Sequence, residues 1–342
     1  MNLSLTKFRE EYLQLLLRFL WRQWSALGVA GQAETGDTWV IDPEALLLLT
    51  CTMGRYDPRL FDEVLDWLTA NERFINVQRI KSLLQKEEFN GDSAASVLAA
   101  VAGTMKREGR RSKWSRLAQL PADSDEERYL FRLPDNSVLP VISQPDPVFR
   151  DYGWLRNPVE LRGLSKAFPA YATPCLWLRL RALFGVNARC EIILYLLIAG
   201  RSNSSEIAQQ THYFPRTIQD ALAELSASGL LTGQRLGRER LYWLKNIEKW
   251  EALFSLAASE IHWVCWAPLF AALESLWLCI QADAFDEAPP MLQMSQLRKL
   301  VRTSVGRKLA RSGLNISLPD AEATSGMEYL EQLLEALHRL LG

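Results

Sequence analysis

The sequence predicts a mainly α protein whose small β content is confined to a hairpin and a few short strands. Three observations lead to this fold class. Apolar residues recur every three or four positions over long stretches, which is the helical period. The pairs Asp42-Pro43 and Asp57-Pro58 are typical helix starts, because Asp caps a helix and Pro is tolerated at its first position. A chain of 342 residues is also too long for one compact core, so we expect two or three domains.

The composition is that of an ordinary globular protein, with 48% hydrophobic and 23% charged residues. The formal net charge of −1 excludes a basic field over the whole molecule, and with it non-specific coating of nucleic acid. Five scattered cysteines predict buried thiols in a reducing compartment rather than a disulfide framework. The charged segment Met1–Arg9 lacks the apolar run of a signal peptide, so we expect a cytoplasmic protein.

The first part of the chain predicts a series of helices. A stripe of apolar residues indicates a helix over Thr6–Leu27, and the two Asp-Pro pairs begin helices that end at Gly54 and near Asn71. Shorter helices are expected over about Val77–Gln85 and Ser93–Met105. The short turns fit a helix-turn-helix-like cluster, such as a degenerate second winged helix, and they fit a plain helical bundle equally well.

Charged and turn-forming segments follow. Lys106–Arg116 is a dense basic run that includes Trp114, and Pro121–Glu127 is an acidic linker. Alternating apolar residues and prolines over Tyr129–Phe149 predict one or two short strands. We interpret the basic run as a solvated surface, in preference to a nucleic-acid contact in which Trp114 stacks on bases.

After about Asn246 the chain is again expected to be helical. The apolar stretch Ile261–Gln281 is long enough to span a membrane, but its charged and polar residues favour a helix buried in a core or a dimer interface. The last helix, Met327–Leu341, has a leucine stripe that suits docking onto another helix. A cationic cluster within residues 298–311 is interpreted as a solvated or salt-bridged face. We expect dimerisation through the tryptophans of this region, which are Trp250, Trp263, Trp266 and Trp277.

The pattern is most regular between about residues 187 and 245. A helix with the sequence CEIILYLLIAG stops at Gly200, SSEIAQQT gives a second short helix, and HYFP is the turn before a third. The buried face of the third helix, RTIQDALAELSASG, consists of Ile218, Leu222 and Leu225. Two strands joined by a Gly-containing loop then follow, at Leu230–Thr232 and Leu241–Leu244. Three helices followed by a hairpin predict a winged helix-turn-helix domain.

This segment resembles the DNA-binding domain of ArsR- and MarR-type winged-helix regulators. The correspondence lies in EIA at Glu206–Ala208, TIQDALAELSASGLL at Thr217–Leu231 and GRERLYWL at Gly237–Leu244. The resemblance implies that the third helix enters the major groove, while the hairpin wing touches the DNA backbone or minor groove. The sequence departs from these regulators at the turn HYFP, where they more often have small residues.

Polar residues at the start of the third helix are the candidate readers of bases. Arg216 and Gln219 are residue types that make bidentate contacts with guanine and adenine edges, and Thr217 accompanies them. The outward-facing Asp220 would repel phosphate and argues against this interpretation. Candidate contacts to the phosphate backbone or a narrow groove are Ser204, Ser205, Arg235, Arg238 and Arg240.

No sequence motif indicates catalysis. The chain contains no phosphate-binding loop, nucleophile elbow or zinc-protease motif. Carboxylates such as Asp62, Glu63 and Asp66 occupy amphipathic helix faces, where we expect solvation rather than acid–base chemistry. The three histidines are far apart and no C-x-C pair occurs. We therefore expect no metal, no cofactor and no enzymatic activity.

These observations favour a sequence-specific transcription regulator that binds double-stranded DNA as a homodimer and acts as a repressor or autoregulator. The alternative is a non-catalytic interaction subunit, such as an antitoxin-like partner in a toxin–antitoxin or phage-defence complex. We expect an N-terminal helical domain (1–120), a linker with short strands (121–180), the winged helix (181–246) and a helical dimerisation region (247–342).

Overall fold

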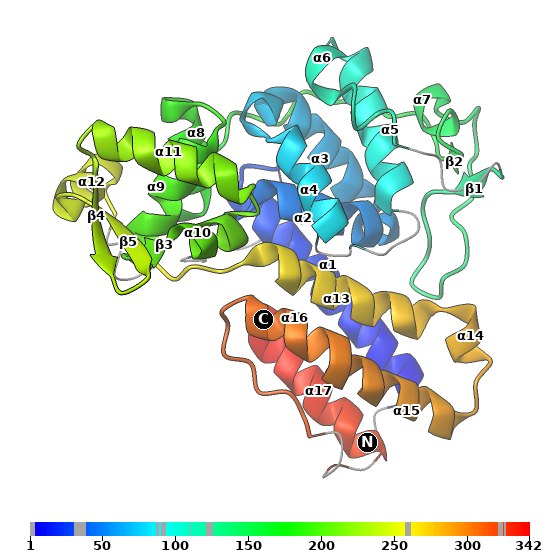
Figure 1. The fold of residues 1–342 in the computed structure, drawn as a ribbon. Helices are drawn as coiled ribbons and strands as arrows, with labels where there is room; N and C mark the ends of the chain where they lie inside the picture. The colour runs from blue at the N-terminus through cyan, green and yellow to red at the C-terminus, as the bar shows by residue number, and fades with distance from the viewer. Residues whose placement is uncertain are drawn as a thin grey trace.

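The computed structural model describes residues 4–30, 39–86, 89, 94–109, 111–120, 126–256, 261–320, 324 and 326–342. Within these residues the chain is mainly helical, as the sequence predicts, and its sheets are small (Figure 1). Buried apolar residues fall into two clusters. One joins the N-terminal and C-terminal helices, and the other belongs mainly to the segment between residues 176 and 261.

The N-terminal helices form with the caps that the sequence predicts. The Asp42 carboxylate accepts hydrogen bonds from two backbone N–H groups at 3.0 and 3.1 Å, and Asp57 caps the next helix with one such bond, at 3.0 Å. Each carboxylate satisfies N–H groups that a helix start otherwise leaves unpaired. The elements are α1 (Leu5–Ala26), α2 (Pro43–Met53), η1 (Gly54–Tyr56), α3 (Pro58–Asn71), η2 (Glu72–Phe74), α4 (Val77–Lys86) and α5 (Ala94–Arg107).

Helix α2 lies at the centre of this bundle. All of its residues are buried, and it packs against α1, α4, α5 and α13. A helix-turn-helix reads DNA with an exposed helix face, which α2 does not have. Helix α2 is therefore no recognition helix, and the two alternatives for the N-terminal region, a helix-turn-helix-like cluster and a plain helical bundle, both stay predictions.

The C-terminal helices complete the same core. Helix α13 packs on α2 and α1, and α17 packs on α1, which places the last helix of the chain alongside the first (Figure 1). Between α1 and α13, the Tyr12 hydroxyl donates a hydrogen bond to the Leu273 carbonyl, at 2.9 Å. The elements are α13 (Trp266–Gln281), α14 (Asp283–Asp286), α15 (Pro290–Leu300), a π-helical turn η5 (Val301–Val305), α16 (Gly306–Arg311) and α17 (Gly326–Leu341).

The tryptophans expected to support a dimer pack within the chain instead. Trp266 and Trp277 are buried against the N-terminal helices, Trp250 is buried in the second cluster, and Trp263 is half-buried beside it. Three of the four indoles are therefore covered within the chain itself, and Trp263 is partly covered. The apolar stretch that ends at Gln281 is accounted for by α13, a buried helix of 16 residues. Within the described ranges, no helix is both long and apolar enough to cross a membrane.

Between residues 111 and 175 the described chain contains little regular structure. Its elements are α6 (Arg111–Trp114), β1 (Arg128–Tyr129), α7 (Pro147–Arg150), β2 (Trp154–Leu155) and η3 (Thr173–Cys175). The strands predicted over Tyr129–Phe149 reduce to the two-residue β1, which pairs in parallel with β2, and one isolated bridge. Residues 121–125 of the predicted acidic linker lie outside the described residues. Trp114 is buried and donates to the Glu72 carboxylate, so its ring is not available for stacking on bases.

Two carboxylates that were expected to be solvated are buried. Asp66 accepts hydrogen bonds from the backbone N–H groups of Gly163 and Ser165, both at 2.8 Å, and Glu63 pairs with Arg162. Both acids lie on α3 and fix the extended segment 162–165 onto it. The prediction of solvation was wrong because an amphipathic pattern does not show that irregular chain covers the polar face.

The second cluster is built from five helices and a three-stranded sheet. They are α8 (Leu176–Phe184), α9 (Ala188–Ala199), β3 (Ser202–Asn203), α10 (Ser204–Thr211), α11 (Pro215–Ala227), β4 (Leu231–Leu236), β5 (Glu239–Leu244) and α12 (Ile247–Phe254). The sheet order is β3-β5-β4, and both pairings are antiparallel. The hairpin strands are longer than predicted. Figure 1 shows this part at the left, with the β4–β5 hairpin projecting from the helices.

Candidate nucleic-acid interface

Helix α11 separates an apolar face from a polar one. Ile218, Leu222 and Leu225 are buried, as predicted, and hold the helix against α9 and α10. The residues expected to face outward do so, because Arg216, Thr217, Gln219 and Asp220 are all exposed. The polar face therefore lies in solvent at the N-terminal half of the helix.

The N-terminus of α11 is open to an anion. Phe214 occupies the N-cap position, its side chain makes no capping hydrogen bond, and 66% of it is exposed. Backbone N–H groups at a helix start carry partial positive charge and bind phosphate well. The bulky turn residue that departs from ArsR- and MarR-type sequences thus leaves the helix start uncapped.

Helix α10 starts beside the hairpin. Its N-cap Asn203 accepts a hydrogen bond from the Glu206 N–H and donates one to the Glu239 carboxylate of β5 at 3.0 Å. Of the two candidate phosphate contacts on this helix, Ser205 is exposed and Ser204 is half-buried. The Asn203–Glu239 hydrogen bond fixes the start of α10 relative to β5.

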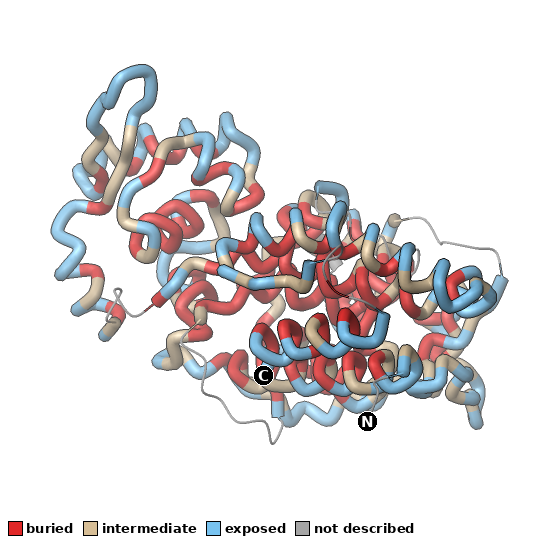
Figure 2. Tube along the Cα trace, turned by 90° about the horizontal axis from the view of Figure 1, so that it is seen from below, coloured by how far each residue is buried: buried red, intermediate tan, exposed pale blue. Residues whose placement is uncertain are grey.

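The hairpin presents three arginines. Leu236 pairs with Glu239, which leaves the two-residue turn Gly237-Arg238. Gly237 has a φ of +63°, and Gly at the first turn position is typical of a type II′ hairpin. Arg238 at the tip and the cross-strand pair formed by Arg235 and Arg240 are exposed. Figure 2 shows the hairpin projecting at the upper left, with its tip coloured as exposed.

Arg240 is held by its neighbours rather than extended freely. Its guanidinium lies 5.4 Å from the centroid of the Tyr242 ring. A Cβ atom at Gly233 would stand 2.8 Å from the Arg240 Nε atom, so a larger residue there would displace the Arg240 side chain. The side chain of Arg235 donates a 3.3 Å hydrogen bond to the Gly237 carbonyl. The cationic surface of the hairpin is therefore partly organised in advance.

Carboxylates oppose part of this positive charge. The Arg216 guanidinium lies 3.2 Å from the Asp220 carboxylate one turn along α11, with 83% and 55% of the two side chains exposed. An ion pair this exposed is worth little energy, because water screens it. A ligand phosphate can therefore compete with Asp220 for Arg216.

Two further cations border this surface and were not predicted. Arg201, just before β3, lies 4.8 Å from the centroid of the Trp243 ring on β5. Lys86, at the end of α4, lies 4.9 Å from the Phe214 ring at the start of α11. The sequence shows that both residues are basic, but not where they lie. Only the tertiary packing of α4 against the α10–α11 turn brings Lys86 to this place.

A buried ionic network joins this part of the molecule to the N-terminal bundle. Arg181 of α8 donates to Glu44 of α2 and to Glu191 of α9, and all three side chains are fully buried. Arg79 of α4 pairs with both oxygens of Asp42, at 2.6 and 2.7 Å, and with Glu44 at 2.9 Å. These two arginines and three carboxylates leave a formal charge of −1 inside the protein.

Burial and the arginines shift the pKa values of two acids in this network. Burial raises the pKa of Glu191, although Arg181 opposes this effect. Burial also acts against ionisation of Asp42, but the charge and hydrogen bonds of Arg79 outweigh it and lower the pKa of that carboxyl. The network holds α8 and α9 against α2 and α4, and its charge balance depends on both arginines.

The α10–α11 turn is anchored by the same contacts. Arg79 Nε donates to the Thr211 carbonyl at 3.0 Å, and Asn76 donates to the Tyr213 hydroxyl at 2.5 Å. His212 adopts a left-handed conformation, with a φ of +59°, and its ring Nε2 lies 3.5 Å from the Cys265 Sγ. Burial lowers the pKa of His212 to about 3, and the Arg79 charge acts in the same direction. The turn that leads into α11 is therefore rigidly held.

Among the described residues, no group of three His, Cys, Asp or Glu side chains is arranged to hold a metal ion. Comparisons with protein-family models, with curated proteins and with solved structures gave no match.

Proposed function

We propose that residues 187–245 form a winged helix-turn-helix domain and that the protein is a non-enzymatic transcription regulator that binds specific sites in double-stranded DNA. The observation that carries this proposal is an exposed polar start of α11 combined with a β-hairpin that presents three exposed arginines. The order helix, strand, helix, helix, hairpin is the order of a winged helix.

In this proposal α11 enters the major groove. Arg216 and Gln219 contact base edges, and Thr217 and the uncapped helix start contact the flanking phosphates. Ser205 and Ser204 contact phosphate from the start of α10. The hairpin follows the backbone or the minor groove with Arg235, Arg238 and Arg240. Repression or autoregulation follows if the occupied site overlaps a promoter.

A salt titration of binding to the DNA upstream of the protein's own gene tests this proposal. We expect binding that weakens linearly on a log–log plot of affinity against salt. Arg216→Ala is expected to reduce affinity by about 1–3 kcal/mol, roughly 5- to 150-fold, and to relax specificity at one base pair. Arg238→Ala is expected to lower the salt slope by about one.

Arg18→Ala is the matched control, because Arg18 is an exposed arginine on α1, outside this surface. It should leave both affinity and slope unchanged. A folded protein that binds no DNA at low salt would contradict the proposal. Equal losses for all three variants would also contradict it, because they would show a general charge effect.

The second candidate function is that of a protein-binding subunit. The observation that favours it is apolar exposure on the same part of the molecule, where Phe214 and Leu236 are 66% and 67% exposed and Leu183 and Leu253 are more than half exposed. An apolar protein interface responds weakly to salt. Binding to a co-purified protein that persists at high salt, without DNA binding at low salt, would favour this candidate.

A further inference from the structure

The β4–β5 hairpin has two faces of different chemistry. The pairing register fixes them, because successive side chains along a strand point to opposite faces of the sheet. Leu231 and Leu244 pair at the base of the hairpin, and both are buried in the second cluster. The face that carries them therefore packs on the helices at its base. We call it the inner face of the hairpin, and we call the reverse side the outer face.

The inner face is cationic toward the tip of the hairpin. After the leucine pair, the next pair on this face is Gly233 with Tyr242. The last pair is Arg235 with Arg240, and both arginines are exposed. Within the two strands, the inner face thus carries two arginines and no acid, a formal charge of +2.

The outer face has a balanced charge. Arg201, just before β3, adds a cation that lies 4.8 Å from the centroid of the Trp243 ring. Glu239 adds a carboxylate, which accepts a hydrogen bond from Asn203 at 3.0 Å. The strand residues of this face are Thr232, Gln234, Leu236, Glu239, Leu241 and Trp243. The uncompensated positive charge of the strands therefore lies on the inner face alone.

Two features of the inner face act against stability. Arg235 and Arg240 stand directly opposite each other, and like charges in this position repel. Gly233 lies inside β4, where a glycine weakens a strand and often marks a place that a ligand approaches closely. Unfavourable local choices of this kind are expected at functional sites. Both features therefore indicate that the inner face binds a ligand of negative charge.

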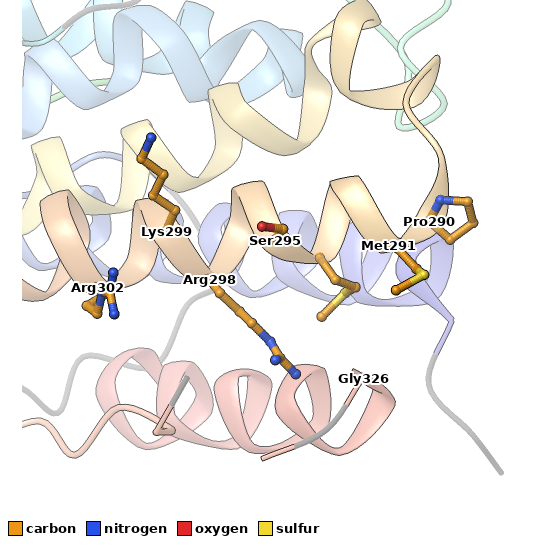
Figure 3. Close-up of a pocket in the computed structure, with 8 residues that line it drawn as sticks. Pro290, Met291, Ser295, Arg298, Lys299, Arg302 and Gly326 are labelled. Atoms are coloured by element: carbon orange, nitrogen blue, oxygen red, sulfur yellow. The ribbon is translucent and has the colours of Figure 1, made fainter. Parts of the chain in front are cut away.

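The cationic region within residues 298–311 is arranged differently. Figure 3 shows Arg298 and Lys299 pointing to opposite sides of α15, so these two cations do not share one face. Arg298 donates to the Thr324 carbonyl at 2.7 Å, and the buried Lys308 donates to the Ser275 hydroxyl at 2.9 Å. The cations of the hairpin, by contrast, form one cross-strand pair on one face.

The two hairpin arginines lie along the sheet rather than away from it. The Arg240 guanidinium is stacked on the Tyr242 ring, with 5.4 Å between the guanidinium and the ring centroid. The Arg235 side chain donates to the Gly237 carbonyl at 3.3 Å. An arginine that enters a narrow minor groove has to extend into it. Side chains held flat on a strand are better placed to meet phosphate groups that pass over the sheet.

We propose that the DNA phosphate backbone lies against the inner face of the hairpin, at Arg235 and Arg240, and that the outer face does not contact DNA. This assignment of faces rests on the DNA-binding function proposed above and adds the side from which DNA meets the hairpin. Phosphate groups beside both guanidinium groups offset the repulsion between them, and hydrogen bonds from arginine to phosphate are strong because both partners are charged.

A salt titration of binding to a fluorescein-labelled DNA duplex of arbitrary sequence tests the assignment, because phosphate contacts do not depend on the base sequence. Arg235→Gln and Arg240→Gln should each reduce the steepness of the plot of log affinity against log salt by about one. The matched controls change the charge equally on the outer face. Gln234→Glu alters the neighbour of Arg235, and Arg201→Gln removes an arginine that is stacked on an aromatic ring, as Arg240 is. Both controls should leave the slope unchanged.

The outcomes separate the assignment of faces from the function on which it rests. If the wild type binds the duplex and the inner and outer variants reduce the slope equally, DNA binding stands and the assignment is wrong. The assignment is also wrong if only the outer variants reduce the slope. If the folded wild type binds no duplex at low salt, both proposals fail. Thermal melts check that each variant is folded, which we expect because all four side chains are exposed.

Discussion

Arginine–carboxylate pairs occur in two opposite settings in this protein. Arg181 meets Glu44 and Glu191 with all three side chains fully buried, whereas Arg216 meets Asp220 in solvent on α11. The buried pairs fix the position of α8 and α9 against the N-terminal bundle. The exposed pair contributes little to stability, so the Arg216 guanidinium can exchange Asp220 for a ligand group. The same residue types thus form a buried structural contact in one place and an exposed, weakly held pair in the other.

The largest test of this comparison removes a buried arginine. Arg181→Met leaves Glu191 without its cationic partner and Glu44 with Arg79 alone, so we expect the free energy of unfolding to fall by about 3–5 kcal/mol. Glu191→Gln instead removes the surplus negative charge and is expected to cost less than about 1 kcal/mol. Urea denaturation of both variants measures the difference. Equal losses would show that the charge balance of the network is unimportant.

A second test uses the buried turn that leads into α11. The pKa of His212 is about 3 in the folded protein, below the ordinary value of 6.5, so protons bind better to the unfolded chain. This contribution to stability is complete above pH 6.5 and is lost as the pH falls toward 3. Between pH 7 and pH 5 we expect a loss of about 2 kcal/mol.

His212→Asn provides the control for that pH dependence, since Asn tolerates the left-handed conformation and does not titrate. The difference in unfolding free energy between this variant and the wild type should shrink from pH 7 to pH 5. A difference that stays constant over this range would show that His212 does not cause the pH dependence of the unfolding free energy.

A smaller effect is expected from the acid on α11. Asp220→Asn frees Arg216 and removes a repulsive charge, so we expect DNA affinity to rise about two- to threefold, an energy of about 0.5 kcal/mol. Glu224→Gln is the matched control, because Glu224 is another exposed acid on α11 and pairs with Arg189. An equal gain in both variants would indicate a general charge effect.

The smallest effect on stability is expected for the exposed arginine itself. Arg216→Ala should change the free energy of unfolding by no more than about 0.5 kcal/mol, because the side chain is 83% exposed. The same substitution is expected to weaken DNA binding. A loss of stability close to that of Arg181→Met would show that the two settings do not differ as described.

The parts of the fold that follow from local sequence were predicted well. Asp42 and Asp57 cap their helices, and Ile218 and Leu222 are buried on α11, because caps and helical periodicity involve neighbours in the chain. The exposure of Arg216 and Gln219 was predicted for the same reason. Their proposed contacts with bases remain predictions.

The parts that depend on distant contacts were missed. Periodicity shows that Trp266 and Trp277 are buried, but it does not show against what, and the α1 and α2 contacts that cover them come from the other end of the chain. The burial of Glu63 and Asp66 and the position of Lys86 beside Phe214 have the same origin. Charged residues were read as solvated because their partners are distant in sequence.

The sharing of one core by the two ends of the chain has a consequence for biosynthesis. That core contains residues from Phe8 to Leu341, so it cannot close until the C-terminal helices have left the ribosome. The second core, apart from Val40, is drawn from residues 176–261 and is complete about eighty residues earlier. The part of the molecule that carries α11 and the hairpin can therefore form first. At that stage the apolar faces of α1 and α2 are not yet covered by α13 and α17.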